Sequence, residues 1–473
     1  MTNHAELGDW LDERQERFIA IANDIWMRPE LALAETYACG RQADDLAADG
    51  FTITRNVGDL PTAFTAEWGS GAPVIGFLGE YDALPNLSQR AESGQAQALA
   101  GGAGHGCGHN LLGTASLAAA SAVKAWLEET GQPGTVRYYG CPAEEIGAGK
   151  VFMARAGAFD GLDAAITWHP GEKNTVWGSS SLAIDHIKFR FHGQTAHAAG
   201  NPELGRSSLD AVELTNIGVN FMREHIIEQA RIHYVITNGG GAPNVVPDDA
   251  EVWYFIRAPH RAQVEELTAW VRKIARGAAM MTETRLEEHE IHGLHNYLPN
   301  RTLADVAGVA LEGLGPIEFT AEEREFAAQV VAGYPKATRT GALSSLNLSP
   351  EAVGQSLLSD YFPLNDWGKT LSGSTDVAEV SWMAPTVQVT TACWAPGVPG
   401  HSWGITACGG MSIGHKGMLH AAKGMAITAA ALHTDPTLLT RAQADYREAT
   451  GGRPYRAPLE DGTAPPRPRP AKG

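Results

Sequence analysis

The residues with the clearest potential for metal chemistry lie in a glycine-rich segment, GHGCGHN at 104–110. In this segment a thiol, Cys107, and an imidazole, His109, alternate with glycine, so an extended loop would turn both side chains to one side. Thiolate and imidazole bind borderline-soft divalent cations such as zinc, and glycines let the backbone wrap closely round the ion. A buried structural cysteine, or a cysteine nucleophile with histidine as its base, is the alternative.

Two adjacent carboxylates, Glu144 and Glu145, follow the apolar run TVRYYGC. A metal hydrolase needs one carboxylate to hold an ion. It needs a second, free one to take a proton from the attacking water and deliver it to the leaving amine. Adjacent glutamates can divide these two tasks. A solvated acidic loop or a helix N-terminus is the alternative explanation for this pair.

Two further histidines lie near the ends of other apolar or Gly/Pro-rich runs. His169 follows AAITW, and His401 lies in VPGHSWG. A hydrogen-bonded structural histidine is the alternative at either position. Taken with the donors above, however, the set comprises one thiolate, three imidazoles and a carboxylate, which can hold two metal ions if one ligand bridges them.

The elements that must position these donors alternate between strand and helix. The stretch 73–85 is typical of a short strand running into a polar loop, 111–129 of a long helix, and 164–170 of another strand. Periodic apolar residues from Leu7 to Met27 predict an amphipathic helix. This order predicts an α/β fold around a mostly parallel sheet, with ligand sites beyond the carboxyl ends of the strands.

A second module interrupts this pattern. Two stretches that alternate apolar and polar residues, HIKFRFHG and AEVWYFIRA, bracket a helical stretch. They indicate a small α+β domain with one sheet face solvated or paired with another subunit. We place this insertion at 184–297, between the two parts of a catalytic domain at 1–183 and 298–440. A proline-rich tail is expected at 441–473.

The composition limits the class of function. The chain has 473 residues, 44% of them hydrophobic and 19% charged, which is a globular balance and enough for two domains. A formal net charge of −18 argues against nucleic acid as a partner. Five thinly spread cysteines argue against a disulfide framework and favour the cytoplasm. We expect neither a signal peptide nor a membrane span.

The chain resembles the M20 family of metallopeptidases, in the branch that acts on N-acyl and N-aroyl amino acids. The matching blocks occur in the family's order and are DALP at 82–85, GCGHN at 106–110, PAEE at 142–145, His169, GQTAHA at 193–198, APNVVPDDA at 242–250 followed by Arg257, and GHSW at 400–403. The blocks STDVAEVSW at 374–382 and HKGMLHAAKGMA most resemble the B-subunit group of the aminobenzoyl-glutamate hydrolases.

The resemblance implies a zinc-peptidase/phosphorylase-like catalytic domain and two divalent metal ions, zinc or manganese. The implied ligands are Cys107, which would bridge the two ions, and His109, Glu145, His169 and His401. Glu144 would be the general base, and Asp82 would orient a ligand imidazole through its other nitrogen.

The inserted module would be the family's lid and dimerisation domain. By resemblance, His197 is expected to reach the active site of a partner subunit and stabilise the oxyanion, while Asn244 and Arg257 hold the carboxylate of the substrate.

The chain departs from the family pattern near the expected metal site. Asn110 stands where aspartate usually follows CGH, and Glu80 stands where many relatives have aspartate. His105 is a possible extra ligand or pocket wall.

The expected function is metal-dependent hydrolysis of the amide bond of an N-acyl or N-aroyl amino acid, with p-aminobenzoyl-glutamate as the substrate that the resemblance favours. A homodimer through the lid is expected. One alternative is a related subunit that is active only in a heteromer, and another is a hydrolase with Cys107 as nucleophile. The sequence indicates no role for residues 333–372.

Overall fold

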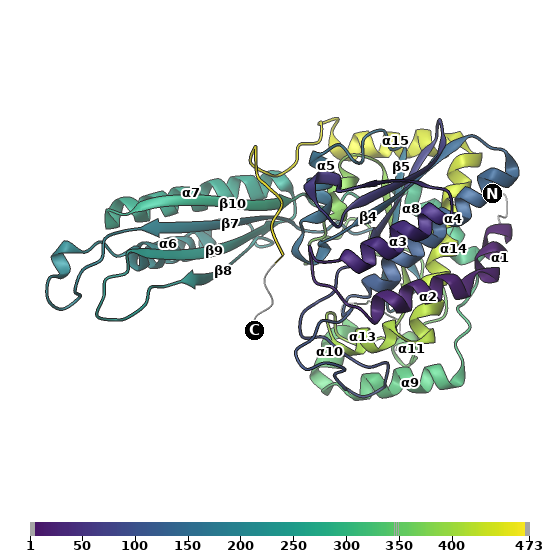
Figure 1. Ribbon diagram of the computed structural model, residues 1–473, viewed down its shortest axis with the longest axis horizontal. Helices are drawn as coiled ribbons and strands as arrows, with labels where there is room; N and C mark the ends of the chain where they lie inside the picture. The colour runs from purple at the N-terminus through teal and green to yellow at the C-terminus, as the bar shows by residue number, and fades with distance from the viewer. Residues whose placement is uncertain (1–4, 345, 347, 349, 469–473) are drawn as a thin grey trace.

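The computed structural model describes residues 5–344, 346, 348 and 350–468. Figure 1 shows a large body, which holds the first and the last helices of the chain, and a narrower arm, which we call the lid. Each part has a sheet of its own. The predicted α/β class with a mostly parallel central sheet is confirmed.

The body is built on a seven-stranded sheet of order β1-β2-β4-β3-β5-β11-β6. Its strands are β1 (Thr52–Arg55), β2 (Phe64–Ser70), β3 (Val74–Glu80), β4 (Gly134–Cys141), β5 (Ala164–Gly171), β6 (Thr175–Val176) and β11 (Thr386–Ala392). The four central strands are parallel and almost wholly buried, as parallel strands covered by helices should be. Their carboxyl ends therefore meet at one edge of the sheet.

Helices cover both faces of this sheet. The helices of the body are α1 (Ala5–Glu13), α2 (Gln15–Trp26), α3 (Thr36–Ala48), α4 (His109–Thr130), α5 (Gly149–Arg155), α8 (Arg301–Gly313), α9 (Ala321–Ala332), α10 (Lys336–Ser344), α11 (Pro350–Val353), α12 (Val377–Ser381), α13 (Trp403–Gly409), α14 (Ser412–Thr434) and α15 (Pro436–Thr450). Within the described ranges, none of the helices combines the length and the apolar character needed to cross a membrane.

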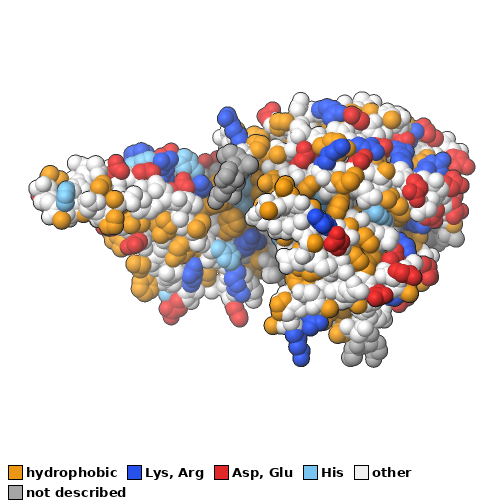
Figure 2. All heavy atoms as spheres, turned by 60° about the horizontal axis from the view of Figure 1, so that its bottom comes forward, with side chains coloured by type: hydrophobic (Ala, Val, Ile, Leu, Met, Phe, Trp, Pro, Cys, Tyr) orange, Lys and Arg blue, Asp and Glu red, His pale blue; other side chains and the backbone are white. Residues whose placement is uncertain are grey.

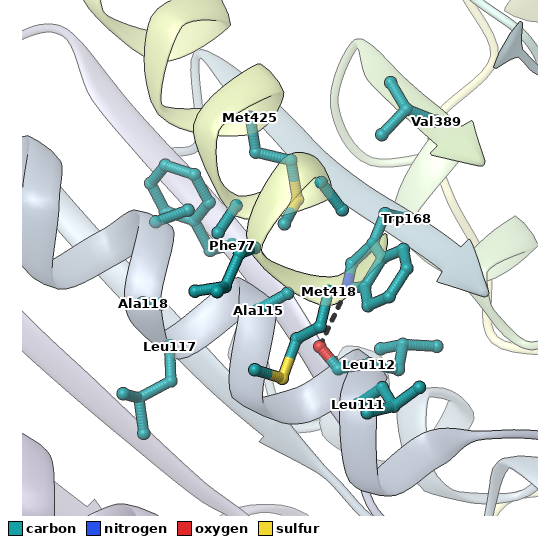
Figure 3. Close-up of a cluster of buried hydrophobic side chains, with 14 of the residues drawn as sticks. Phe77, Leu111, Leu112, Ala115, Leu117, Ala118, Trp168, Val389, Met418 and Met425 are labelled. Carbon is teal, nitrogen blue, oxygen red and sulfur yellow. Dashed lines mark hydrogen bonds between the residues drawn. The ribbon is translucent and has the colours of Figure 1, made fainter. Parts of the chain in front are cut away.

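The packing of α4 and α14 against the sheet fixes two of the candidate metal ligands. Figure 3 shows Trp168 of β5 beside Leu112 of α4 and Met418 of α14. The indole N–H of Trp168 donates to the carbonyl of Leu112 at 2.9 Å. Since Trp168 precedes His169 and Leu112 follows His109 by three residues, this buried contact sets the two imidazoles relative to each other.

The prediction of a single helix from Leu7 to Met27 is wrong, because α1 and α2 are separated at Arg14. Helix α1 packs mainly on α14, and α2 packs mainly on α4. The break lets each apolar face follow a different neighbour.

The lid contains a four-stranded antiparallel sheet of order β10-β7-β9-β8, covered by two helices. Its elements are β7 (Ala183–His192), α6 (Ser208–Met222), β8 (Arg231–Asn238), β9 (Asp249–Ala258), α7 (Arg261–Thr282) and β10 (Arg285–Leu294). The chain enters the lid at β7 and leaves it after β10, so Ala183 and Leu294 mark the end next to the body. The loops 193–207 and 239–248 lie at the opposite end, the tip (Figure 1).

The carboxyl-terminal segment returns to the junction of body and lid (Figure 1). The predicted start of a tail at 441 is wrong, because α15 continues to Thr450. Beyond the helix, the carbonyl of Pro458 accepts a hydrogen bond from the N–H of Gly293 at 2.8 Å. Leu459 packs against buried residues of β7 and β10. The segment therefore contacts both strands that connect the lid to the body.

Residues 333–372 contain α10 and α11 and then run beside the body sheet. The N–H of Phe362 donates to the carbonyl of Asn174 at 2.7 Å, and Tyr361 forms a parallel bridge with the same residue. In its latter part, this segment thus extends the edge of the sheet at β6.

Candidate metal centre

Five predicted ligands meet at the carboxyl edge of the body sheet. Their donor atoms form two groups, and within each group all atoms lie within 4.8 Å of one another. Cys107 belongs to both groups. The first group consists of Cys107, His109 and His169. The second group consists of Cys107, Glu145 and His401. A thiolate shared by two three-donor clusters is an arrangement suited to two metal ions.

The contacts inside the two groups are close. Sγ of Cys107 lies 3.3 Å from Nε2 of His169. Nε2 of His401 lies 3.4 Å from Oε2 of Glu145. The donor atoms therefore face one another rather than the surrounding protein.

A left-handed glycine brings Cys107 and His109 together. Gly108 has φ 79° and ψ 21°, and His109 is the first residue of α4. The prediction of an extended loop is therefore wrong, because the chain turns sharply at Gly108 before the helix begins. A Cβ atom at this position would also lie 3.1 Å from the ring of Pro170, so space as well as conformation favours glycine.

Two non-glycine residues at the site also have left-handed backbones. Ala143, with φ 59°, precedes the short 3-10 helix η2 (Glu144–Ile146), and His401 has φ 50°. Such conformations are disfavoured for residues with a Cβ and concentrate at functional sites. At Ala143 this conformation turns the chain into the short helix that carries Glu144 and Glu145.

Asp82 contacts two of the candidate ligands at once. Its Oδ1 lies 2.9 Å from Nδ1 of His109, and its Oδ2 accepts a hydrogen bond from the N–H of Glu145 at 2.9 Å. The opposite atoms of the two ligands, Nε2 of His109 and Oε1 of Glu145, are buried and have no hydrogen-bond partner in the described part of the chain. Buried polar atoms are normally satisfied, so this donor set fits divalent cations.

Burial is the main influence on the pKa values of Cys107, His169 and the two glutamates, whereas at His109 the contacts with Cys107 and Asp82 outweigh burial and raise the pKa. Burial raises the pKa of the Cys107 thiol, so a thiolate here requires a nearby cation. Burial lowers the pKa of His169 to about 4, which keeps its imidazole neutral, as a metal ligand must be. The pKa of Glu144 is raised well above its usual value, mainly by burial and to a smaller extent by the neighbouring carboxylate of Glu80. The pKa of Glu145 is raised to about 7, mainly by burial.

The donors open into a cleft of about 1210 Å³ between body and lid. Trp177 and Trp394 line it from the body, and Lys188, Trp253 and Arg257 line it from the end of the lid next to the body. The walls are largely apolar and aromatic, with a few charged groups. Such a cleft suits a small ligand with an apolar part and an anionic part.

Arg257 is a cation with no acidic partner among the residues that the structure describes. Its Nη1 donates to Oγ of Ser374 at 2.8 Å, and no carboxylate among the described residues forms an ion pair with it. Burial lowers the pKa of this guanidinium, which reflects the cost of holding the charge away from water. A carboxylate on a ligand would offset that cost.

The lid tip holds the two predicted residues that do not reach this cleft. His197 and Asn244 are exposed, and His197 forms a bridge with Val245. His186 of β7 lines the cleft, and His192 ends the same strand. A strand rises about 3.3 Å per residue, so His192 lies roughly 20 Å from His186. The tip loops begin beyond that point, so neither predicted residue joins the donors of its own chain.

His105 and Asn110 have structural contacts. The Nε2 atom of His105 is buried 3.3 Å from the carbonyl of Ile25, and the residue is outside both donor groups and the cleft lining. The prediction of an extra ligand or pocket wall is therefore wrong. Asn110 donates to the carbonyl of Gly409 at 3.1 Å, which ties the start of α4 to α13.

Comparison with known proteins agrees with this geometry. A model described as "Peptidase family M20/M25/M40" matches residues 76–460. The chain belongs to this family. It is 45% identical over 470 residues to the B-subunit of the p-aminobenzoyl-glutamate hydrolase of Escherichia coli K12, covering 97% of this chain and 98% of that protein.

Two solved structures show the same fold at low sequence identity. An aminobenzoyl-glutamate utilization protein from Klebsiella pneumoniae matches at 17% identity with a TM-score of 0.59, covering 89% of this chain and 97% of that one. A dinuclear metal-binding M20 peptidase from Bacillus subtilis matches at 19% identity with a TM-score of 0.54, covering 87% and 98%. The predicted class, a metal-dependent hydrolase of the M20 amidohydrolases, is confirmed.

Three charged residues of this M20 centre were not predicted as part of the site. Lys150 Nζ lies 2.6 Å from Oε1 of Glu80 and 2.6 Å from Oδ1 of Asp376. Glu80 was noted from the sequence as a departure, without a role. Asp376 lies in the block STDVAEVSW, whose resemblance to the B-subunit group was the available signal. Lys150 gave no signal of its own.

Proposed function

We propose that this protein hydrolyses the amide bond of N-acyl or N-aroyl amino acids with the aid of two divalent metal ions. Within this class of substrates, we propose p-aminobenzoyl-glutamate as the preferred compound. The observation that carries the proposal is the pair of donor groups sharing Cys107 beside a further carboxylate, Glu144. The 45% identity to one subunit of a p-aminobenzoyl-glutamate hydrolase supports the choice of substrate.

The mechanism assigns one task to each residue. Bound divalent cations supply Lewis acidity and lower the pKa of water. Glu144 takes a proton from the attacking water and later gives it to the departing amine. Arg257 holds the carboxylate of the substrate from the lid wall, and closure of the lid excludes water. His197 of the partner subunit would donate to the developing oxyanion, and Asn244 of the partner subunit would help to hold the carboxylate of the substrate.

We infer that the ligand atoms favour zinc. The five ligands Cys107, His109, Glu145, His169 and His401 combine one soft thiolate with imidazoles and a carboxylate. Thiolate and imidazole suit zinc, while carboxylate and imidazole also accept manganese. Either ion is compatible with the donor set.

We propose that the lid forms the contact between subunits. Strand β8 is one of the two edge strands of the lid sheet, and Tyr234, Val235 and Ile236 on it are exposed. Ile217 and Phe221 are exposed on the neighbouring helix α6, and Figure 2 shows hydrophobic side chains gathered along the lid. An unpaired strand edge with apolar side chains favours association with a second lid. Such a contact could bring the lid tip of one subunit to the cleft of the other.

The second subunit is proposed to be a copy of this chain, with a related chain as the alternative. The heteromer is favoured by one observation, that the E. coli relative is named as the B-subunit of its hydrolase. We also propose a cytoplasmic location, since all five cysteines are free.

The function is tested with the purified chain, p-aminobenzoyl-glutamate and defined metals. We expect hydrolysis by the zinc- or manganese-loaded chain alone, loss of activity with a chelator, and recovery when the metal is returned. Activity that appears only after addition of a related subunit would support the heteromer. Activity that survives complete metal removal would support Cys107 as nucleophile and contradict the proposal.

Arg257→Ala should raise KM for carboxylate-bearing substrates about tenfold or more while changing kcat less. The reason is that a charge-assisted hydrogen bond contributes about 1.5–3 kcal/mol, and about 1.4 kcal/mol is a factor of ten. Arg276→Ala is the matched control, because Arg276 is an exposed arginine of α7 that pairs with Glu288 of β10. Steady-state kinetics with the acid and its amide analogue measure the effect. An unchanged KM for the acid would remove Arg257 from the substrate site.

A further inference from the structure

A buried ion cluster lies directly behind the candidate metal ligands. Lys150, on α5, is completely buried, and its ammonium contacts the carboxylates of Glu80 and Asp376 at 2.6 Å each. The backbone N–H of Lys150 also donates to the second oxygen of Asp376 at 2.9 Å. The lysine is thus fixed by Asp376 at both its main chain and its side chain.

Glu80 connects this cluster to the metal donors. It is the last residue of β3, and Lys150 engages its Oε1. The other oxygen, Oε2, lies 3.4 Å from Nε2 of His109. Glu80, His109 and Glu144 form a third group of possible donors whose atoms lie within 4.8 Å of one another. The second oxygen of Glu80 therefore faces the same nitrogen that His109 would use to bind an ion.

The charges of the cluster are unbalanced in the direction that favours a cation. Lys150 is a single ammonium that pairs with two buried carboxylates, Glu80 and Asp376. Glu144 lies near the same point, with its Oε2 4.0 Å from Nε2 of His109. A buried salt bridge is costly unless its charges are compensated, so a purely structural cluster would be expected to balance them. The excess negative charge lies on the His109 side, where a divalent ion would offset it.

We propose that Glu80 is a further carboxylate donor to the ion held by His109, and that Lys150, anchored by Asp376, is a positioning residue that directs it by engaging its other oxygen. The proposal rests on the dinuclear centre of the proposed function. It accounts for two features of the sequence together: the glutamate at position 80 and the aspartate of the STDVAEVSW block.

The test measures metal binding by the metal-free full-length chain. Zinc and manganese are titrated separately by calorimetry, and bound metal is counted by mass spectrometry. The variants are Glu80→Gln, which leaves Lys150 paired with Asp376, Lys150→Met, and the double variant that combines them. Lys124→Met is the control, because Lys124 forms a 2.8 Å ion pair with Glu128 on α4 away from the site.

The expected result is a wild-type chain with two bound ions and variants that bind one of them about 10–100-fold more weakly, with the other unchanged. The melting temperature of metal-free Glu80→Gln should stay close to that of the wild type, because Lys150 keeps its ion pair with Asp376. Wild-type affinity for both ions in Glu80→Gln and in the double variant would overturn the proposal. So would equal weakening of both ions with a lowered melting temperature, which indicates a structural role. A wild-type chain that binds no ion would instead refute the proposed function itself.

Discussion

Replacing Glu144 by glutamine should lower kcat by roughly 10²–10⁴-fold or more while both ions stay bound. Glu144 is beside the donor groups that share Cys107 but belongs to neither of them. Glutamine has nearly the same shape and can accept a hydrogen bond, but it cannot take a proton from water at neutral pH. The change therefore removes the proton carrier without removing a ligand.

The measurement combines turnover of p-aminobenzoyl-glutamate with a count of bound metal in the same preparation. Glu128→Gln is a suitable control, since Glu128 is half exposed near the end of α4. Loss of metal together with activity would show that Glu144 is itself a ligand. Retained activity would contradict its role as general base.

Replacing Cys107 by alanine should remove both ions, because Cys107 is the donor that the two groups share. We expect the affinity for each ion to fall by more than about 100-fold, beyond the loss typical of residues that merely orient a ligand. His169→Ala and His401→Ala should each weaken one ion more than the other, since each belongs to a single group.

Calorimetric titration of the metal-free variants distinguishes these patterns, with Cys39→Ala as the control because Cys39 is a buried free thiol on α3. A Cys107→Ala chain that holds two ions with native affinity would contradict the bridging role. If that chain also lacked activity, the nucleophile interpretation of Cys107 would gain support.

Much of the body could be predicted because the signals for its elements are local. The strands at 74–80 and 164–171 and the helix from 109 to 130 each have an apolar pattern that does not depend on distant residues. The separation of α1 and α2 at Arg14 could not be predicted in this way. It depends on contacts with α4 and α14, which lie far along the chain.

The metal donors could be predicted from residue types near strand ends, but their supporting contacts could not. The conformation at Gly108 is one example, since glycine permits both the extended loop and the observed turn. Lys150 is another, because a lysine near the start of a short helix is usually solvated. Its partner Asp376 is 226 residues away, and only the folded chain brings the two together.

The course of the carboxyl-terminal segment has a practical consequence for handling the protein. Pro458 is bonded to the strand that leads out of the lid, and Pro466 and Arg467 line the cleft. An affinity tag or fluorescent protein joined directly after Arg467 would therefore begin beside the cleft. The first helix lies at the opposite end of the body from the lid (Figure 1). A fusion joined directly before α1 would therefore begin away from the cleft.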